Sequence, residues 1–160
     1  MAHQARHDNL TNLLGHRAFH EAIEELVDAG DPFTLATIDL DDFKKINDLC
    51  GHPVGDEALR RVSAAMLAAV RTADKVFRVG GEEFAVLLPG LPALDAVPVA
   101  ERMRRSVASV PFDPSLSISI GLAGYPDDSD SKAGLIERAD VALYAAKRSG
   151  KDRTIVATAD

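Results

Sequence analysis

The sequence has one cysteine, no tryptophan and 5% aromatic residues among its 160 positions, and it contains no long apolar run. The single thiol, Cys50, cannot form an internal disulfide and excludes a zinc site built on cysteines. No segment approaches the roughly 20 apolar residues of a membrane-spanning helix, and residues 1–8 lack the apolar core of a signal peptide. We therefore expect a cytoplasmic protein without membrane contact, in which any metal is held by carboxylates or histidines.

Basic residues are in the minority. The 18 lysines and arginines are outnumbered by 25 aspartates and glutamates, which gives a formal net charge of −7. An acidic surface repels nucleic-acid phosphates unless a local basic patch opposes it, so we expect no nucleic-acid partner. The content of 46% hydrophobic and 27% charged residues is typical of a folded soluble chain, long enough for one domain with its own core.

Hydrophobic periodicity predicts helices that alternate with strands. The predicted helices span residues 17–29, 43–49, 54–70, 92–107 and 132–147, and the predicted strands span residues 33–40, 75–79, 83–88, 116–123 and 153–157. Gly80 and Gly81 separate two of these strands and predict a tight hairpin, because glycine tolerates positive φ. Gly51 and Pro53 predict a break between helices over residues 50–53. Since the hairpin interrupts the alternation, we expect an α/β sandwich with a mixed, partly antiparallel sheet rather than a doubly wound parallel sheet.

Several common signatures are absent, including the Walker phosphate loop, the dinucleotide-binding glycine pattern and the nucleophile elbow. His16 and His20 have the helical spacing of a zinc-binding pair. No third ligand or carboxylate base is evident near them, and zinc sites use three or four protein ligands. We therefore interpret the two histidines as surface residues of a helix.

Three aspartates, at positions 39, 41 and 42, surround the end of the strand predicted over residues 33–40. One interpretation is helix capping, in which Asp41 or Asp42 satisfies the free amides of the helix that begins at Phe43. Capping needs only one of them. Asp39, together with the hairpin glutamates at positions 82 and 83, would instead place hard oxygen ligands at one sheet edge, which suits Mg²⁺ with a bound phosphate.

A signature on the hairpin connects these acids. Residues 78–84 read Arg-Val-Gly-Gly-Glu-Glu-Phe, the Gly-Gly-Glu-Glu-Phe form of the motif that names the GGDEF domain. Further matches follow in order at residues 8–13 (DNLTNL), 38–44 (IDLDDFK), 46–48 (IND), 51–56 (GHPVGD), 117–121 (SISIG) and 139–147 (ADVALYAAK). The chain therefore resembles a diguanylate cyclase over nearly its whole length. We expect a stub over residues 1–7 and one such domain over residues 8–158.

The resemblance implies an enzyme of bacterial second-messenger signalling, associated with biofilm formation, on a fold similar to the palm of polymerases and nucleotide cyclases. Such enzymes join two GTP molecules into cyclic di-GMP and release two pyrophosphates. Each domain binds one GTP, so the resemblance implies a homodimer, commonly driven by an N-terminal sensor domain in a longer parent chain. It also implies two Mg²⁺ or Mn²⁺ ions per active site, held by Asp39, the backbone carbonyl of Leu40, and Glu82. Glu82 is a candidate proton acceptor and Glu83 a supporting acid.

The resemblance also assigns the substrate contacts. Asn47, His52 and Asp56 would recognise guanine. A carboxylate only accepts hydrogen bonds, so it matches the N1–H and N2–H₂ edge of guanine and has no partner at adenine N1. The resemblance also implies a set of residues that bind or surround the phosphates: Asp42, Phe43, Lys44, Gly80, Gly81, Lys147 and Lys151. It implies a catalytic role for Lys44 as well.

Arg71 and Asp74 form an Arg-x-x-Asp motif ahead of the hairpin. On the residues alone, an ordinary surface ion pair is the simpler interpretation. The resemblance assigns them to an inhibitory site for the product, with Arg102 as a secondary contact.

The chain departs from the family pattern at Gly15, His16, Cys50, Lys151 and Asp152. None of these changes removes a metal-binding, base-binding or phosphate-binding group. Two alternatives stay open: a catalytically silent receptor for cyclic di-GMP, and a related cyclase that uses ATP. The intact acids at positions 39 and 82 favour an enzyme, and Asp56 favours GTP.

Overall fold

The computed structural model describes residues 6–158. Its helices and strands, in chain order, are α2 (His16–Ala29), β1 (Phe33–Leu40), α3 (Phe43–Cys50), α4 (His52–Ala69), β2 (Lys75–Arg78), β3 (Glu83–Pro89), α5 (Ala93–Ala108), β4 (Ile118–Tyr125), α6 (Lys132–Arg148) and β5 (Thr154–Val156). Each predicted element is present, with bounds within two residues of those expected. No helix in this described part of the chain is long and apolar enough to span a membrane.

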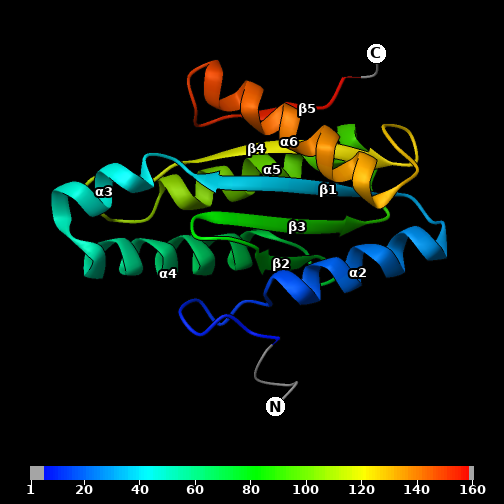
Figure 1. Ribbon diagram of the computed structural model, residues 1–160. Coiled ribbons are helices and arrows are strands. Elements are labelled where there is room, and N and C mark those ends of the chain that lie inside the picture. The colour runs from blue at the N-terminus through cyan, green and yellow to red at the C-terminus, as the bar shows by residue number, and fades with distance from the viewer. Residues whose placement is uncertain (1–5, 159–160) are drawn as a thin grey trace.

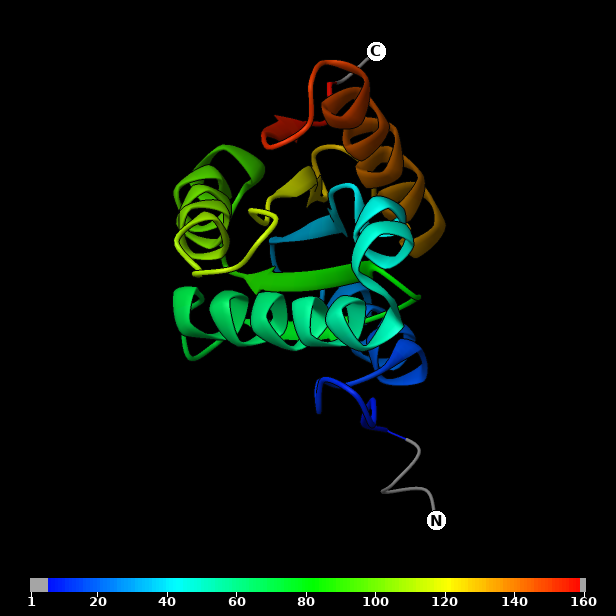
Figure 2. The same cartoon turned by 90° about the vertical axis from the view of Figure 1, so that its left-hand side faces the viewer.

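The strands form one mixed sheet in the order β2-β3-β1-β4-β5. β1 pairs antiparallel with both β3 and β4, and β4 pairs parallel with the short edge strand β5. Figures 1 and 2 show the sheet between two helical layers, with α4 and α5 over one face and α2 and α6 over the other. The expected sandwich with a mixed, partly antiparallel sheet is confirmed.

Side-chain alternation along β1 divides the core. Ala36 and Ile38 pack with residues of α4 and α5, whereas Phe33 and Leu35 pack with residues of α2 and α6. Because successive strand residues point to opposite faces, Asp39 belongs to the face covered by α6. The strand pattern thus turns this acid toward the last helix of the domain.

The hairpin between β2 and β3 differs from the expected tight turn. Its strands are separated by residues 79–82, and neither Gly80 nor Gly81 is among the described residues with positive φ. The turn is held instead by Arg78, whose Nε and Nη2 donate to the carbonyl of Gly81 at 3.0 and 2.8 Å. The positive-φ explanation for the two glycines is therefore wrong.

The expected break between α3 and α4 is shorter than predicted. Only Gly51, at φ 91°, separates the two helices, and His52 and Pro53 form the first turn of α4. Proline is well tolerated there because the first helical amides have no intrahelical partner in any case.

Part of the predicted stub packs on the domain. Residues 1–5 lie outside the described residues, but the carbonyl of Arg6 accepts from the amide of Gly15 at 2.7 Å. The guanidinium of Arg6 also pairs with Glu21 at 2.8 Å. The limits predicted for the stub and for the domain over residues 8–158 stay predictions.

Candidate functional site

Asp39 is a buried acid near the end of β1, with 5% of its surface exposed. Lys147 reaches it from α6 and donates from Nζ to Oδ2. Burial lowers the pKa of Lys147, and the positive charge of Lys151 lowers it further. The other carboxylate oxygen, Oδ1, is buried without a hydrogen-bond partner in the described structure. An unpartnered buried acceptor is costly, so this oxygen favours a cationic or hydrogen-donating ligand.

The hairpin brings its two glutamates to the same end of the sheet. Asp39 lies opposite Glu83 in the ladder between β1 and β3. The amide of Leu40 donates to the carbonyl of Glu82 at 3.1 Å. The structure therefore places Asp39, Leu40 and Glu82 next to one another at this end of the sheet.

These groups suit a hard divalent cation by their chemistry. Two carboxylates and a backbone carbonyl are the oxygen ligands that Mg²⁺ takes, and Oδ1 of Asp39 is free to coordinate. Within residues 6–158 no three histidine, cysteine or acidic side chains are already grouped around a common point for a metal ion. Since Lys147 occupies Oδ2 of Asp39, its movement would open the carboxylate to a metal.

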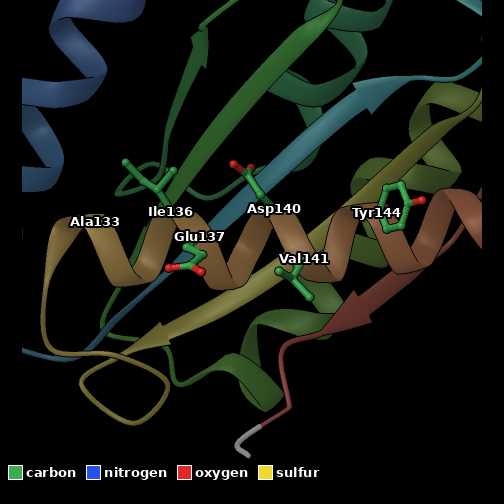
Figure 3. Close-up of a pocket in the computed structure, with 6 residues that line it drawn as sticks. All are labelled: Ala133, Ile136, Glu137, Asp140, Val141 and Tyr144. Carbon is green, nitrogen blue, oxygen red and sulfur yellow. The ribbon is translucent and has the colours of Figure 1, made fainter.

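A cavity of about 220 Å³ lies beside Asp39 between β1 and α6. It is lined by Thr37, Asp39, Glu83, Asp140, Leu143, Tyr144 and Lys147. Asp140 and Tyr144 also line an open hollow on the outer side of α6, which Figure 3 shows. Burial raises the pKa of Asp140, and the negative charge of Glu83 adds to the effect.

The sequence reasoning missed Asp140. Its signal was present, because positions 140, 144 and 147 recur at helical spacing and place three polar groups on one face of α6.

The capping interpretation of the aspartates is wrong. Asp42 is the N-cap residue of α3, but it has a left-handed φ of 57° and no side-chain capping bond. Its carboxylate pairs with Lys151 at 2.6 Å instead, and this bond lowers the pKa of Asp42. Asp41 bonds the hydroxyls of Ser117 and Ser119 at 2.7 and 2.6 Å. The first-turn amides of α3 therefore receive no cap from either acid.

Two lysines from the C-terminal part of the chain bond acids near the start of α3. Lys147 and Lys151, from the end of α6 and the loop after it, bond Asp39 and Asp42. Lys44 lies in the first turn of α3 and is exposed. Two of the three predicted phosphate-binding lysines therefore form ion pairs with aspartates, and the third, Lys44, lies on α3.

The predicted guanine-binding residues lie at the corner between α3 and α4. Asn47 is on α3, and His52 and Asp56 are in the first turns of α4. Oδ1 of Asn47 is buried without a partner in the described residues. A Cβ on Gly55 would lie 1.8 Å from this oxygen, so glycine is required for the close packing of α3 on α4. Gly55 was not singled out from the sequence, although a glycine inside a helical pattern signals close packing.

Arg71 and Asp74 form a more buried pair than the surface interpretation assumed. The side chain of Asp74 is fully buried, and Nη2 of Arg71 lies 2.5 Å from its Oδ1. Arg71 also donates to the carbonyl of Pro89 at 2.8 Å, and Arg102 donates from Nε to the carbonyl of Ala69 at 2.5 Å. The three predicted residues therefore lie near the C-terminal end of α4. This end is ~27 Å from the predicted guanine-binding corner, given 18 helical residues.

The two histidines of α2 contact each other. Nε2 of His16 lies 3.1 Å from Nε2 of His20. Burial lowers the pKa of His20, and the charge of Lys132 adds to the effect. Their interpretation as helix surface residues stays a prediction.

Arg78 connects the hairpin turn to the start of the domain, and sequence reasoning did not identify this role. Besides holding Gly81, it donates from Nη1 to both carboxylate oxygens of Asp8 at 3.0 Å. Burial alone would raise the pKa of Asp8, but the hydrogen bonds from Thr11 and Arg78 outweigh it and lower the pKa.

The chain is similar to known proteins over most of its length. Residues 5–153 match the family model described as "Diguanylate cyclase, GGDEF domain". Diguanylate cyclase DgcM of Escherichia coli K12 is 42% identical over 164 residues, covering 98% of this chain and 40% of DgcM. Response regulator PleD of Caulobacter vibrioides is 38% identical over 159 residues, covering 92% of this chain and 35% of PleD. The chain thus spans about two fifths of the length of these relatives.

A solved structure has the same fold. It contains the coiled coil and GGDEF domain of DgcB from Caulobacter crescentus in complex with c-di-GMP. The two chains superpose with a TM-score of 0.88 at 31% sequence identity, over 98% of this chain and 87% of the DgcB chain.

Proposed function

The chain belongs to the GGDEF domain family of diguanylate cyclases, and from that premise we propose that it condenses two GTP molecules into cyclic di-GMP. The observation that carries the proposal is the buried, unpartnered Oδ1 of Asp39 beside Leu40 and Glu82. A receptor that only binds the product has no need of this costly arrangement of acids.

We assign Asp39, the carbonyl of Leu40, and Glu82 to two Mg²⁺ or Mn²⁺ ions. When bound, these ions lower the pKa of the attacking 3′-hydroxyl and neutralise the triphosphate. Glu82 is our candidate acceptor for the hydroxyl proton, and Glu83 supports it as a second acid. In the reaction the 3′-oxygen of one GTP bonds to the α-phosphorus of the other, and the bond to pyrophosphate breaks.

Phosphate binding is assigned to the basic groups around the start of α3. Lys147 leaves Asp39 for phosphate oxygens, while Lys44 and Lys151 hold the outer phosphates with the amides near Asp42 and Phe43. These amides have no side-chain cap, and a helix N-terminus favours an anion. Gly80 and Gly81 keep the hairpin turn small beside the triphosphate.

Guanine is assigned to the corner between α3 and α4. Asp56 accepts from N1–H and N2–H₂, and the side-chain amide of Asn47 supplies the second contact, with His52 nearby. The unpartnered Oδ1 of Asn47 supports this assignment, because a donor on the base would satisfy it.

Two copies of the chain must meet for the reaction. Each site binds one GTP, and each GTP supplies one 3′-hydroxyl and one α-phosphorus. We therefore propose a homodimer with facing sites, formed within a longer parent protein that carries a sensor domain. The relatives support the longer parent, because the matched region is 40% of DgcM and 35% of PleD.

We assign Arg71, Asp74 and Arg102 to product inhibition. Arginine matches the O6 and N7 edge of guanine, and a carboxylate matches N1–H and N2–H₂. Because Arg71 and Asp74 bond each other, the product must open this pair in order to bind. The complex of DgcB with c-di-GMP supports recognition of this ligand within the family.

The test is to incubate the purified chain with GTP and Mg²⁺ over a wide range of protein concentration, with Glu82→Gln as the control. Chromatography should show cyclic di-GMP that rises more steeply than protein concentration, and the control should be inactive. No product at any concentration, with tight binding of added cyclic di-GMP, would establish the receptor instead.

A further inference from the structure

Asp41 is a buried acid to which neither metal binding nor capping gives a role. It is 7% exposed and lies between Asp39 and Asp42. Its Oδ2 accepts from the hydroxyl of Ser117 at 2.7 Å, and its Oδ1 accepts from the hydroxyl of Ser119 at 2.6 Å. Hydrogen bonds to a buried carboxylate are strong, so Asp41 holds its donors in fixed positions.

A third donor comes from the loop between α6 and β5. The amide of Asp152 donates to Oδ2 of Asp41 at 3.1 Å and to the hydroxyl of the fully buried Ser119 at 3.2 Å. Lys151, the residue before it, belongs to the proposed phosphate-binding set. The peptide group between Lys151 and Asp152 therefore links Lys151 to the carboxylate of Asp41.

The loop backbone needs such an anchor. Lys151 and Asp152 have left-handed φ values of 64° and 47°, a conformation in which the Cβ of an ordinary residue crowds the backbone. Two consecutive residues of this kind persist only where the surrounding structure fixes them.

A second network holds the same loop from outside. The carboxylate of Asp152 pairs with Arg104 at 2.9 Å, and Arg104 binds both carboxylate oxygens of Glu101 at 2.9 and 2.8 Å. The side chain of Asp152 is half exposed, whereas Asp41 is buried. Of the two anchors, the one on Asp41 is less accessible to water and is the stronger constraint on the backbone.

We propose that Asp41 is a positioning residue, which fixes the loop that presents Lys151 to the phosphates of the bound nucleotide. Its link to the lysine runs through the amide of Asp152, and the ammonium of Lys151 then reaches the rim of the site at Asp42. The inference rests on the proposed function for the role of Lys151, but the link between Asp41 and the loop is independent of that function.

The test compares Asp41→Ala, Lys151→Ala and the double variant in binding 3′-deoxy-GTP, which cannot react because it lacks the attacking hydroxyl. Asp41→Ala should weaken 3′-deoxy-GTP roughly tenfold, as expected for the loss of one charged contact, and leave GMP binding unchanged. The double variant should bind no more weakly than Lys151→Ala alone. Hydrogen exchange followed by NMR should show that the Asp152 amide is protected in the unsubstituted chain and exchanges faster in Asp41→Ala.

Asp41→Asn and Ser117→Ala keep the test usable if Asp41→Ala does not fold, because each removes only part of the network. Both should speed exchange at the Asp152 amide and weaken 3′-deoxy-GTP to a smaller extent. The proposal is overturned if exchange is unchanged, if losses from Asp41 and Lys151 variants add, or if GMP binding falls equally. If the unsubstituted chain binds 3′-deoxy-GTP no better than GMP, the phosphate site that we assign under the proposed function is refuted, whatever the exchange rate of the Asp152 amide.

Discussion

The ammonium of Lys147 lies on Oδ2 of Asp39, the carboxylate that we assign to metal binding. A positive side chain thus neutralises part of the buried charge that a metal ion would otherwise neutralise. Cation binding and the position of Lys147 are therefore in competition, and this relationship can be measured without nucleotide.

Lys147→Ala should raise the affinity of the nucleotide-free chain for Mn²⁺ by roughly three- to tenfold, because it removes a competing charge worth about 1 kcal/mol. The same variant should lose cyclase activity, since the lysine is also needed at the phosphates. Titration of Mn²⁺ followed by electron paramagnetic resonance measures the affinity. Lys45→Ala is the matched control, because Lys45 is exposed and lies 3.8 Å from Asp42; an equal change in both variants would contradict the competition.

Gly55→Ala should destabilise the fold by about 1–3 kcal/mol, because the added methyl collides with the amide of Asn47. The clash outweighs the roughly 1 kcal/mol that alanine gains in helix propensity. Urea unfolding measures the difference. The double variant Asn47→Ala with Gly55→Ala should recover much of the loss, and no recovery would show that the strain lies elsewhere.

Asp56→Ser should reduce the preference for GTP over ATP by roughly 10- to 100-fold, because serine provides one weaker acceptor in place of two carboxylate oxygens. Competition binding of the two nucleotides measures the preference. Glu57→Gln, one residue along α4, serves as the control because Glu57 pairs with Arg60 and Arg61. An unchanged preference in Asp56→Ser would refute our assignment of the guanine contact.

Arg71→Lys should abolish most product inhibition while the domain stays folded, because lysine keeps the charge beside Asp74 but loses the planar pair of donors. Arg71→Ala should cost roughly 3 kcal/mol of stability as well, since it leaves the buried carboxylate of Asp74 without its ion partner. Inhibition by added cyclic di-GMP and thermal unfolding separate the two effects. Full inhibition of the lysine variant would place the regulatory site elsewhere.

Stability should fall at acidic pH through Glu101. Hydrogen bonds from Arg104 are the main cause that lowers its pKa from 4.5 to about 2; burial opposes them, and the bond from Thr154 adds to them. A carboxyl whose pKa is lower in the folded state stabilises the fold above its unfolded pKa, and this stability is lost as pH falls from about 4.5 toward 2. After solvent screening we expect roughly 1–2 kcal/mol. Urea unfolding across this range should show a shallower loss in Glu101→Gln, and parallel curves would contradict the assignment.

The order of helices and strands could be predicted from the sequence because it depends on local periodicity. The spacing of apolar residues over positions 33–40 predicts a strand, and this prediction does not depend on which strands pair with it. Local reasoning failed at Gly80 and Gly81, since the guanidinium of Arg78 closes that turn from outside the glycines. It also offered capping by Asp41 or Asp42 as one interpretation, because the true partners of Asp41, Ser117 and Ser119, are 76 and 78 residues away in the sequence.

The members of the candidate site were named from a resemblance, but their contacts were not predicted. The bond between Lys147 and Asp39 and the burial of Asp74 depend on how distant segments pack. No pattern within a single segment carries that information. Asp140, which sequence reasoning missed, could have been found from a local pattern, since its spacing to Lys147 places both residues on one face of a helix.

The contact between Asp8 and Arg78 gives the hairpin turn a mechanical connection. The same guanidinium binds the carboxylate of Asp8 and the carbonyl of Gly81, so two short bonds in series join the beginning of the domain to the turn next to Glu82. A force applied at residue 8 would therefore reach this turn without passing through the hydrophobic core. The first loop of the domain and the turn next to Glu82 are thus joined through the side chain of Arg78.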